Sequence, residues 1–447
     1  MDLKINFDNV CGKIKRLHGV NNGPVSYGST VDVSHYFKKA GIPSVRLHDS
    51  NWPHPREVDI HTIFPDFSKD PNDPESYDFS RTDEYLRSII DTGAKIIYRL
   101  GESIEHTQQK YYVHPPRDFK KWAQICLGII RHYNHGWANG FYNNIEYWEV
   151  WNEPDNRAGN ISPMWSGTSK QYFELYNIAS TAIKKFDPKL KVGGFGATMS
   201  HKDFIQDFLE YCRKNKLPLD FFSWHTYTSD PQKIMINSKY VHDQLFRNGF
   251  RETESHLNEW NFFESDFKKL WLQGSEYIRQ DTFEKAKSTV GASFSASVLM
   301  MLQESSVQSS NYFDGQPSAK FCGLFNYYGV PQKTFYAFEA FQHLCQFPLR
   351  IDTAVDNSIN GIYCCGGKNE QDEVAILISN FRGQGRLYSI KMENFIDDSN
   401  RVCQKYMLDD NYDLELVHTC KASQIKDDME IFIPTNSTVL LKIVNKN

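Results

Sequence analysis

Short apolar segments alternate with longer amphipathic segments from residue 17 to residue 345, and this alternation constrains the fold more than any other feature. Apolar runs predict strands, and apolar residues spaced three or four apart predict helices. Strands are predicted at 17–20, 44–49, 94–101, 145–151, 191–197, 221–227, 255–260 and 305–313. Helices are predicted at 31–40, 81–92, 118–132, 168–186, 202–214, 234–247, 283–303 and 334–345. The chain therefore contains eight strand–helix units.

Eight such units are typical of a closed (β/α)8 TIM barrel, an α/β fold, rather than of an open doubly wound sheet. The strand cores are mostly apolar, as a parallel sheet covered on both faces requires. An open sheet would usually have a GxGxxG turn after its first strand, but the turn here is HGVNNGP (residues 18–24). We therefore predict a catalytic barrel over residues 13–345.

The pattern changes after residue 346. Segments such as EVAILISNF and TVLLKIV alternate between apolar and polar residues, and turn residues separate them without a clear helix. Short strands of this kind predict a β-sandwich. We assign residues 346–447 to this smaller accessory domain, and the strand LKINF within residues 1–12 could join its sheet.

Charge and cysteine usage exclude several classes of protein. The 447 residues include 50 Lys and Arg against 55 Asp and Glu, and this net charge of −5 does not suit a nucleic-acid-binding or membrane-surface protein. The nine cysteines include no CxxC pair, which is typical of buried thiols in a reducing compartment. No signal-peptide pattern begins the chain. We expect a cytoplasmic protein, or a secreted or periplasmic one if a signal peptide has been removed.

Polar side chains gather at the predicted ends of the strands. The active sites of such barrels lie at the carboxyl ends of the strands, and charged groups beside apolar strands are costly unless they are paired or functional. The polar residues at these ends are His18, Arg46, His48, Asp49, Glu102, Asn152, Glu153, His225, Tyr227, Asn258, Glu259, Asn261, Tyr312 and Asp314. Because they come from at least six of the eight strands, they predict one site at the barrel mouth.

Two glutamates are the most informative of these residues. Glu153 in EYWEVWNEPD and Glu259 in SHLNEWN close the fourth and seventh predicted strands, whose ends face each other across a barrel of eight. A retaining glycosidase needs two carboxyl groups about 5–5.5 Å apart, one an anionic nucleophile and the other a protonated acid. Either glutamate alone could simply form an ion pair with Arg46 or Arg99. Both motifs together favour glycoside cleavage.

The motifs also resemble a known family. WNEPD, followed by WHTY and LNEWN, resembles the retaining glycosidases of the large barrel clan, and HGVNNGP, VRLHD and YRLGESIEH resemble glycoside hydrolase family 39. That family includes β-xylosidases and α-L-iduronidases, and it joins a barrel to a β-sandwich. The resemblance implies that Glu153 is the general acid/base, that Glu259 is the nucleophile, and that Asn152 binds the sugar 2-OH. It implies no cofactor and no metal.

The resemblance further implies a set of residues around the sugar. His225 and Tyr227, two apart on one strand, would hold the nucleophile and the ring hydroxyls, and Arg46 would position Glu259. The residues predicted to contact substrate are Asn152, His48, Arg46, His225, Tyr227, Trp260, Tyr312 and Asp314. Aromatic residues make up 14% of the chain, and rings at the strand ends either pack the top of the barrel or stack on pyranose faces.

Substrate specificity is less constrained than mechanism. The segment after the eighth strand, NYFDGQPSAKFCGLFN, has Asp314 but lacks the paired acidic residues of the xylosidase pattern. No basic cluster suits a uronate carboxylate, so a neutral glycan is favoured. We predict a retaining, β-xylosidase-like hydrolase of glycosides or oligosaccharides derived from plant or other polysaccharides. Arabinoside, galactoside and glucoside specificities are alternatives, and linkage, exo or endo action and oligomeric state stay open.

Two other classes of protein compete with this prediction. A metal-dependent hydrolase on a barrel often has HxH on its first strand, and this chain has no HxH. A non-catalytic glycan-binding barrel would usually have lost one glutamate, whereas both are present. No nucleic-acid or membrane partner is expected, and members of this family often form homo-oligomers.

Overall fold

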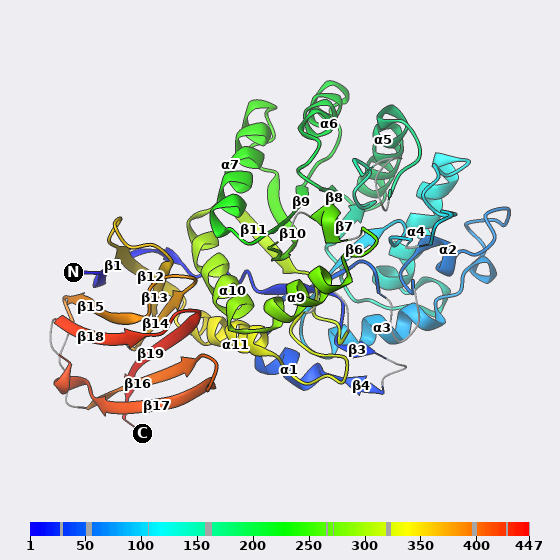
Figure 1. Ribbon diagram of the computed structural model, residues 1–447. Coiled ribbons are helices and arrows are strands. Elements are labelled where there is room, and N and C mark those ends of the chain that lie inside the picture. The colour runs from blue at the N-terminus through cyan, green and yellow to red at the C-terminus, as the bar shows by residue number, and fades with distance from the viewer. Residues whose placement is uncertain are drawn as a thin grey trace.

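The protein was analysed as a computed structural model that describes residues 1–26, 30–50, 56–105, 107–156, 163–264, 267–270, 272–318, 323–395, 400–425 and 428–446. Eight parallel strands close into a barrel in the order β10–β11–β2–β5–β6–β7–β8–β9 (Figure 1). They are β2 (Gly19–Asn21), β5 (Ser44–Leu47), β6 (Lys95–Leu100), β7 (Tyr147–Val150), β8 (Lys191–Ala197), β9 (Phe221–Thr228), β10 (Glu254–Phe262) and β11 (Val307–Tyr312). The predicted (β/α)8 barrel is thus confirmed.

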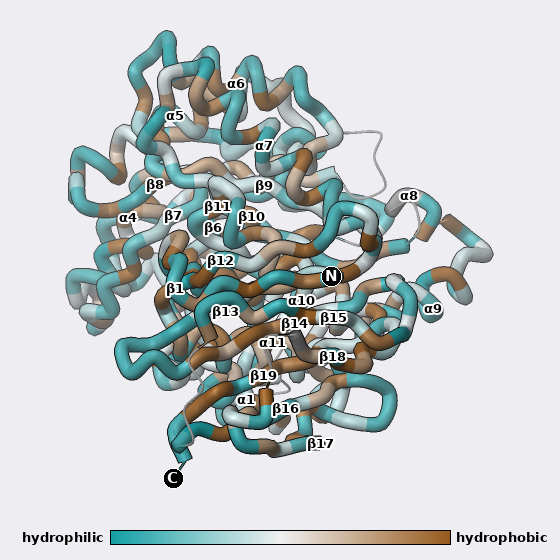
Figure 2. The backbone as a smooth tube through the Cα atoms, turned by 90° about the vertical axis from the view of Figure 1, so that its left-hand side faces the viewer, coloured by the Kyte–Doolittle hydropathy of each residue, from teal (hydrophilic) through white to brown (hydrophobic). Residues whose placement is uncertain are grey.

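Helices follow the barrel strands and cover them. The helices are α1 (Ser34–Lys39), α2 (Ile60–Ile63), α3 (Ser80–Ile90), α4 (Phe119–His135), α5 (Ser169–Phe186), α6 (Lys202–Asn215), α7 (Pro231–Arg247), α8 (Phe267–Leu270), α9 (Glu276–Lys287), α10 (Thr289–Met301) and α11 (Lys333–Cys345). Short 3-10 turns lie at Pro74–Ser76, Trp137–Asn139, Leu302–Glu304 and Ala422–Gln424. In Figure 2 the outer helices α5 and α6 alternate between hydrophilic and hydrophobic residues, because one face of each packs on the barrel.

Three predicted elements differ from the structure. The helix predicted over residues 31–40 begins only at Ser34, and residues 31–32 form a short strand. The helix predicted over residues 283–303 is broken at Ser288, whose backbone is extended and whose hydroxyl accepts a hydrogen bond from the Val290 N–H at 3.2 Å. Ser288 therefore acts as the N-cap of a second helix, α10. The first barrel strand begins at Gly19 rather than at Leu17, so Asn21 and not His18 lies at its carboxyl end.

The accessory part is one nine-stranded sheet with the order β17–β16–β19–β14–β13–β12–β1–β15–β18. Its strands are β1 (Leu3–Lys13), β12 (Leu349–Val355), β13 (Ile362–Lys368), β14 (Val374–Asn380), β15 (Arg386–Glu393), β16 (Arg401–Leu408), β17 (Asp413–Lys421), β18 (Asp428–Ile433) and β19 (Ser437–Asn445). The amino-terminal strand β1 pairs with β12 antiparallel and with β15 parallel. A small hairpin of β3 (Val25–Ser26) and β4 (Val31–Asp32) lies apart from both sheets.

This sheet folds over its own core, as a sandwich does. The Lys405 ammonium of β16 donates a hydrogen bond to the Phe432 carbonyl of β18 at 3.4 Å, although these strands lie near opposite edges of the sheet. One apolar core fills the space between the folded halves, and the other sheet face packs on α10 and α11, so that β14 is buried along its whole length. Figure 1 shows α10 and α11 between the barrel and this sheet.

The described residues contain neither a disulfide nor a membrane-spanning helix. The eight described cysteines form no disulfide, and most of them are buried or partly buried. Among the described residues, no helix is both long enough and apolar enough to cross a lipid bilayer.

Candidate active site

The predicted glutamates meet at the carboxyl ends of the barrel strands. Glu259 lies on β10, and Glu153 follows β7 by three residues. One carboxylate oxygen of each, together with a ring nitrogen of His225, lie within 4.8 Å of one another. The structure therefore brings together the two carboxyl groups from the fourth and seventh barrel strands, as the topology predicts.

Glu259 is held by donors on both of its oxygens. Arg46 donates to Oε1 at 2.8 Å, and the Tyr227 hydroxyl donates to Oε2 at 2.6 Å. Only 5% of Glu259 is exposed. Burial and the nearby Glu259 charge raise the pKa of Tyr227 well above its usual range, so its hydroxyl keeps its proton and remains a donor. This environment stabilises the anionic form of Glu259.

Glu153 has neutral partners instead. Its Oε1 lies 2.6 Å from Nδ1 of His225, and its Oε2 accepts a 3.4 Å hydrogen bond from the Asn156 amide. Burial lowers the pKa of His225 to about 4, so the ring is neutral at physiological pH. Burial raises the pKa of Glu153 to about 7, and the Glu149 charge acts in the same direction. Glu153 can therefore hold a proton at neutral pH.

The backbone after β7 turns sharply to place these groups. Trp151 has φ 71° and Glu153 has φ 47°, both in the left-handed region that non-glycine residues rarely adopt. Asp155 anchors the turn, because its Oδ2 accepts from the N–H and the hydroxyl of Thr198 at 3.0 and 2.7 Å. Strained backbone of this kind concentrates at functional sites, where surrounding contacts maintain it.

Gly196 on β8 gives these side chains their space. A Cβ atom at this position would lie 2.8 Å from Nε2 of His225 and 3.0 Å from Oδ1 of Asn152, and its φ of +67° also favours glycine. Any larger residue would displace one of the two side chains.

Arg46 is the centre of the hydrogen-bond network beneath the two glutamates. This fully buried guanidinium donates to Glu149 at 2.7 Å, Asn21 at 3.1 Å and Asn152 at 2.6 Å, besides Glu259. Burial alone would raise the pKa of Glu149, but Arg46 and further donors hold it below its usual value. Two carboxylates, Glu149 and Glu259, thus share the Arg46 charge, whereas Glu153 does not contact it.

A second group of acids lies on the other side of Glu259. Burial raises the pKa of Asp49 to about 7, and burial together with Asp49 raises that of Asp314 well above its usual range. The Ile104 N–H donates to Asp49 at 2.7 Å. Nε2 of His48 lies 3.4 Å from Asp49 and 3.9 Å from Glu259. Asp49, Asp314 and His48 therefore form a polar wall next to Glu259, in which burial raises the pKa of both aspartates.

Two predicted substrate contacts lie elsewhere. Trp260 and Tyr312 are fully buried, with their ring centroids 5.1 Å apart, and both rings pack on Phe338 of α11. They point outward between the barrel and its helices, because Trp260 neighbours an inward-facing Glu259 and side chains alternate along a strand. Trp260 and Tyr312 therefore lie where they would not contact a sugar at the barrel mouth, contrary to the prediction.

Several residues of the site were not predicted. Glu149 accepts from Ser223 at 2.5 Å and from Asn258 at 2.7 Å, and Asn21 connects Arg46 to the backbone of β10 and β11. A charged residue in the middle of the apolar segment YWEV was the available signal for Glu149. The contacts of Asn21 and Ser223 had no comparable signal, because they depend on how separate strands close the barrel.

Two groups of side chains among the described residues could approach a metal ion. They are Glu153–His225–Glu259 and Asp59–His61–Glu102. In each group a carboxylate already accepts from an arginine, Arg46 for Glu259 and Arg99 for Asp59 at 2.7 Å. A bound cation would therefore compete with a guanidinium at close range, and these donor sets fit a metal poorly.

Comparisons with known proteins show similarity to one family over most of the chain. The family model described as Glycosyl hydrolases family 39 matches residues 36–346. A β-xylosidase from Caldicellulosiruptor saccharolyticus is 26% identical over 331 residues, which is 68% of this chain and 64% of that protein. A β-xylosidase from Geobacillus stearothermophilus is 33% identical over 145 residues, which is 32% of this chain and 25% of that protein.

The same architecture occurs in solved structures. A glucosidase from Croceicoccus marinus superposes with a TM-score of 0.81 at 24% identity, and the match covers 100% of this chain and 99% of that one. At this identity the likeness shows the fold. The chain spans less than two thirds of the length of either matched β-xylosidase, so their activity does not transfer to it directly.

Proposed function

The chain belongs to glycosyl hydrolase family 39, and from that premise we propose that it is a retaining glycosidase with Glu259 as nucleophile and Glu153 as general acid/base. The observation that supports this most is the contrast between two carboxyl groups whose oxygens lie within 4.8 Å. One is stabilised as an anion by Arg46 and Tyr227, and the other has its pKa raised to about 7 by burial. A double displacement needs this pair of states.

In the first step, Glu259 attacks the anomeric carbon while Glu153 gives its proton to the leaving oxygen, so the glycosidic bond breaks as the glycosyl ester forms. In the second step, Glu153 takes a proton from water, and the water oxygen displaces Glu259 from the anomeric carbon. Two inversions at one carbon give net retention. Both side chains return to their starting states, and one water molecule is consumed.

Asn152 is suited to stabilise the transition state. Arg46 fixes its Oδ1 at 2.6 Å, and its buried Nδ2 has no hydrogen-bond partner among the described residues. A buried donor without a partner costs roughly 1–3 kcal/mol, so a sugar hydroxyl that accepts from it gains a strong contact. We assign this donor to the sugar 2-OH.

For substrate class, we propose a neutral glycoside or oligosaccharide, with β-xylosides first. The two matched β-xylosidases support this choice. Arg46 is already tied to two carboxylates and is unavailable for a uronate carboxylate. His48, Asp49 and Asp314 would bind the outer hydroxyls of the sugar. A β-glucoside is the second candidate, because the glucosidase of Croceicoccus marinus matches the whole chain.

A panel of p-nitrophenyl glycosides tests this proposal. The panel contains β-xyloside, α-arabinoside, β-galactoside and β-glucoside, and the first-formed anomer is followed by proton NMR. We expect the highest kcat/KM on the β-xyloside and an initial product with the configuration of the substrate. Preference for the β-glucoside would shift the assignment to the second candidate. Glycan binding without turnover of any substrate would indicate a binding protein and reject the glycosidase.

A further inference from the structure

A cavity of about 410 Å³ lies where the barrel rim meets the accessory sheet. Three segments line it: residues 229–232 between β9 and the first turn of α7, residues 359–363 at the start of β13, and residues 381–382 after β14. The first segment follows the carboxyl end of a barrel strand, so the cavity opens on the face that holds the two glutamates.

Aromatic side chains at the end of β10 pack between the site of Glu259 and the segments that line this cavity. The Tyr227 hydroxyl contacts Glu259, and the Tyr227 ring stacks on Phe263 with centroids 5.0 Å apart. The neighbouring Phe262 ring lies 6.3 Å from that of Phe381, which lines the cavity. The Phe263 N–H also donates to the Thr228 carbonyl, one residue before the cavity wall begins. A chain of linked sugars leaving the catalytic centre over Tyr227 would therefore reach it.

The walls offer a mixture of groups that suits sugar hydroxyls. Asp230 supplies a carboxylate, and Gln232 and Asn360 supply exposed amides that both donate and accept. The Arg382 side chain is 41% exposed and lies over the Phe381 ring at 5.1 Å. Glu264 already pairs with the Arg382 guanidinium, so this cation is not available to an anionic ligand, which favours a neutral one. Tyr363 adds a partly buried ring of the kind that stacks on pyranose C–H faces.

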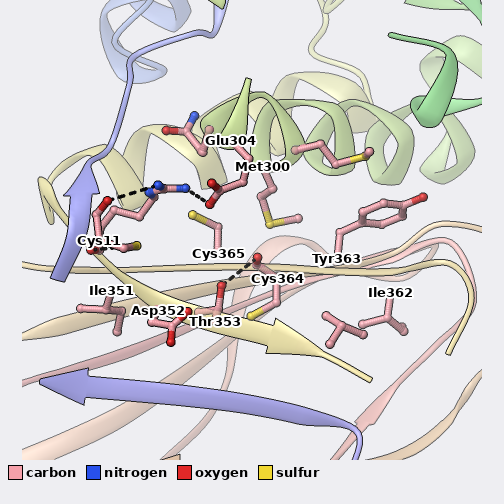
Figure 3. A pocket seen from close by; sticks show the side chains of 14 residues that line it. Cys11, Met300, Glu304, Ile351, Asp352, Thr353, Ile362, Tyr363, Cys364 and Cys365 are labelled. Atoms are coloured by element: carbon pink, nitrogen blue, oxygen red, sulfur yellow. Dashed lines mark hydrogen bonds and ion pairs between the residues drawn. The ribbon is translucent and has the colours of Figure 1, made fainter. Parts of the chain in front are cut away.

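The other cavity at this junction has a different character. It measures about 220 Å³, and sulfur-containing side chains such as Cys11, Met300 and Cys365 line it beside an ion pair of Glu304 with Arg350 (Figure 3). Figure 3 shows Tyr363 at its edge, with the hydroxyl directed away from the cysteines. This smaller cavity offers few groups for a sugar, and it provides a natural control site in the same interface.

We propose that the 410 Å³ cavity is an outer subsite, which binds a neutral pyranose unit of an oligosaccharide whose scissile bond lies between Glu153 and Glu259. The inference rests on the proposed glycosidase function. It means that the accessory sheet takes part in selecting substrates by chain length, through Asn360 and Tyr363. Short glycosides that end before the cavity would not use this contribution.

The test compares two substrates of the same sugar, the p-nitrophenyl monoglycoside and the β-1,4-linked tetrasaccharide (xylotetraose for a β-xylosidase). The double variant Gln232→Ala/Asn360→Ala changes exposed residues that line this cavity, so it should fold. We expect kcat/KM on the tetrasaccharide to fall about tenfold, as for one or two lost hydrogen bonds, with the monoglycoside unchanged. Tyr363→Ala should act in the same direction. Cys11→Ala, at the smaller cavity, should change neither value.

Each other result overturns the inference in a distinguishable way. If the wild type cleaves both substrates and the double variant changes them equally or not at all, the subsite is rejected and the glycosidase stands. If the wild type cleaves the monoglycoside but not the tetrasaccharide, the subsite is rejected as well. If the wild type cleaves neither substrate and no other glycoside of the panel, both proposals fail together.

Discussion

The ends of the fourth and seventh barrel strands present the same side chain in opposite surroundings. Glu259 on the seventh strand accepts from a buried guanidinium at 2.8 Å and from a phenol at 2.6 Å. Glu153 after the fourth strand lies beside a neutral imidazole at 2.6 Å and a distant amide at 3.4 Å. The two glutamates, whose oxygens lie within 4.8 Å, therefore have different partners, and burial raises the pKa of Glu153 to about 7.

Glu153 lacks a guanidinium partner because Arg46 contacts the residue before it in the sequence. Arg46 reaches the strand-four segment at Asn152 rather than at Glu153, and its other contacts go to Glu149 and Glu259. The left-handed backbone at Trp151 and Glu153 flanks Asn152, the residue that Arg46 contacts.

Removing the Glu259 carboxylate should have the largest effect on activity. In Glu259→Ala the anomeric carbon has no nucleophile, so we expect kcat to fall at least about a thousandfold. Azide should restore turnover and give a glycosyl azide of inverted configuration, because it attacks from the vacant face. Product analysis by NMR checks this. Normal activity without azide would contradict the role of Glu259.

Removing the Glu153 carboxyl group should reduce activity to an extent that depends on the leaving group. In Glu153→Ala, substrates with poor leaving groups should lose about 10²–10⁴-fold in kcat/KM, because they need the proton. Activated dinitrophenyl glycosides need little protonation and should lose far less. The slope of log(kcat/KM) against leaving-group pKa, measured over a series of aryl glycosides, is the readout. Equal losses across the series would remove the acid role from Glu153.

Weakening the hydrogen-bond network around Arg46 should have a smaller effect, and it should act on both Glu153 and Glu259. Glu149→Gln leaves Arg46 with one carboxylate fewer, and breaking a buried ion pair costs about 3–5 kcal/mol of stability. Because the Glu149 charge raises the pKa of Glu153, the variant should also move the basic limb of the pH profile to lower pH. Glu146→Gln, at an exposed pair with Lys191, is the matched control and should leave the profile in place. A stability loss with an unmoved pH limb would mean that Glu149 is only structural.

The mildest perturbation is a change of pH. Glu153 acts as an acid in its protonated form, so kcat/KM should fall up to tenfold per unit as the pH rises above its pKa of about 7. The limb should disappear in Glu153→Ala with an activated substrate. Persistence of the same limb in that variant would assign it to another group.

The sequence predicted the barrel because buried parallel strands are continuous apolar runs and each was followed by an amphipathic helix. It also predicted Glu153, Glu259, His225 and Tyr227 at the barrel mouth, because strand ends converge there. Their catalytic roles remain predictions.

Other features depend on tertiary contacts that the pattern of residues does not encode. The turn at Trp151 and the pairing of Arg46 with Glu149 require the closed barrel. Trp260 was misplaced because the alternation of β10 directs it outward, beside the inward Glu259. The break at Ser288 depended on one N-cap hydroxyl between a polar helical segment and an apolar one.

The most direct test of the central claim is covalent trapping of the nucleophile. A 2-deoxy-2-fluoro glycoside with a good leaving group, of the sugar that the panel selects, slows the second step more than the first, so the glycosyl enzyme accumulates. Digestion and mass spectrometry then locate the added sugar. We predict that it is attached to Glu259. Attachment to Glu153, or to any other residue, would contradict the assignment of Glu259 as the nucleophile and Glu153 as the general acid/base.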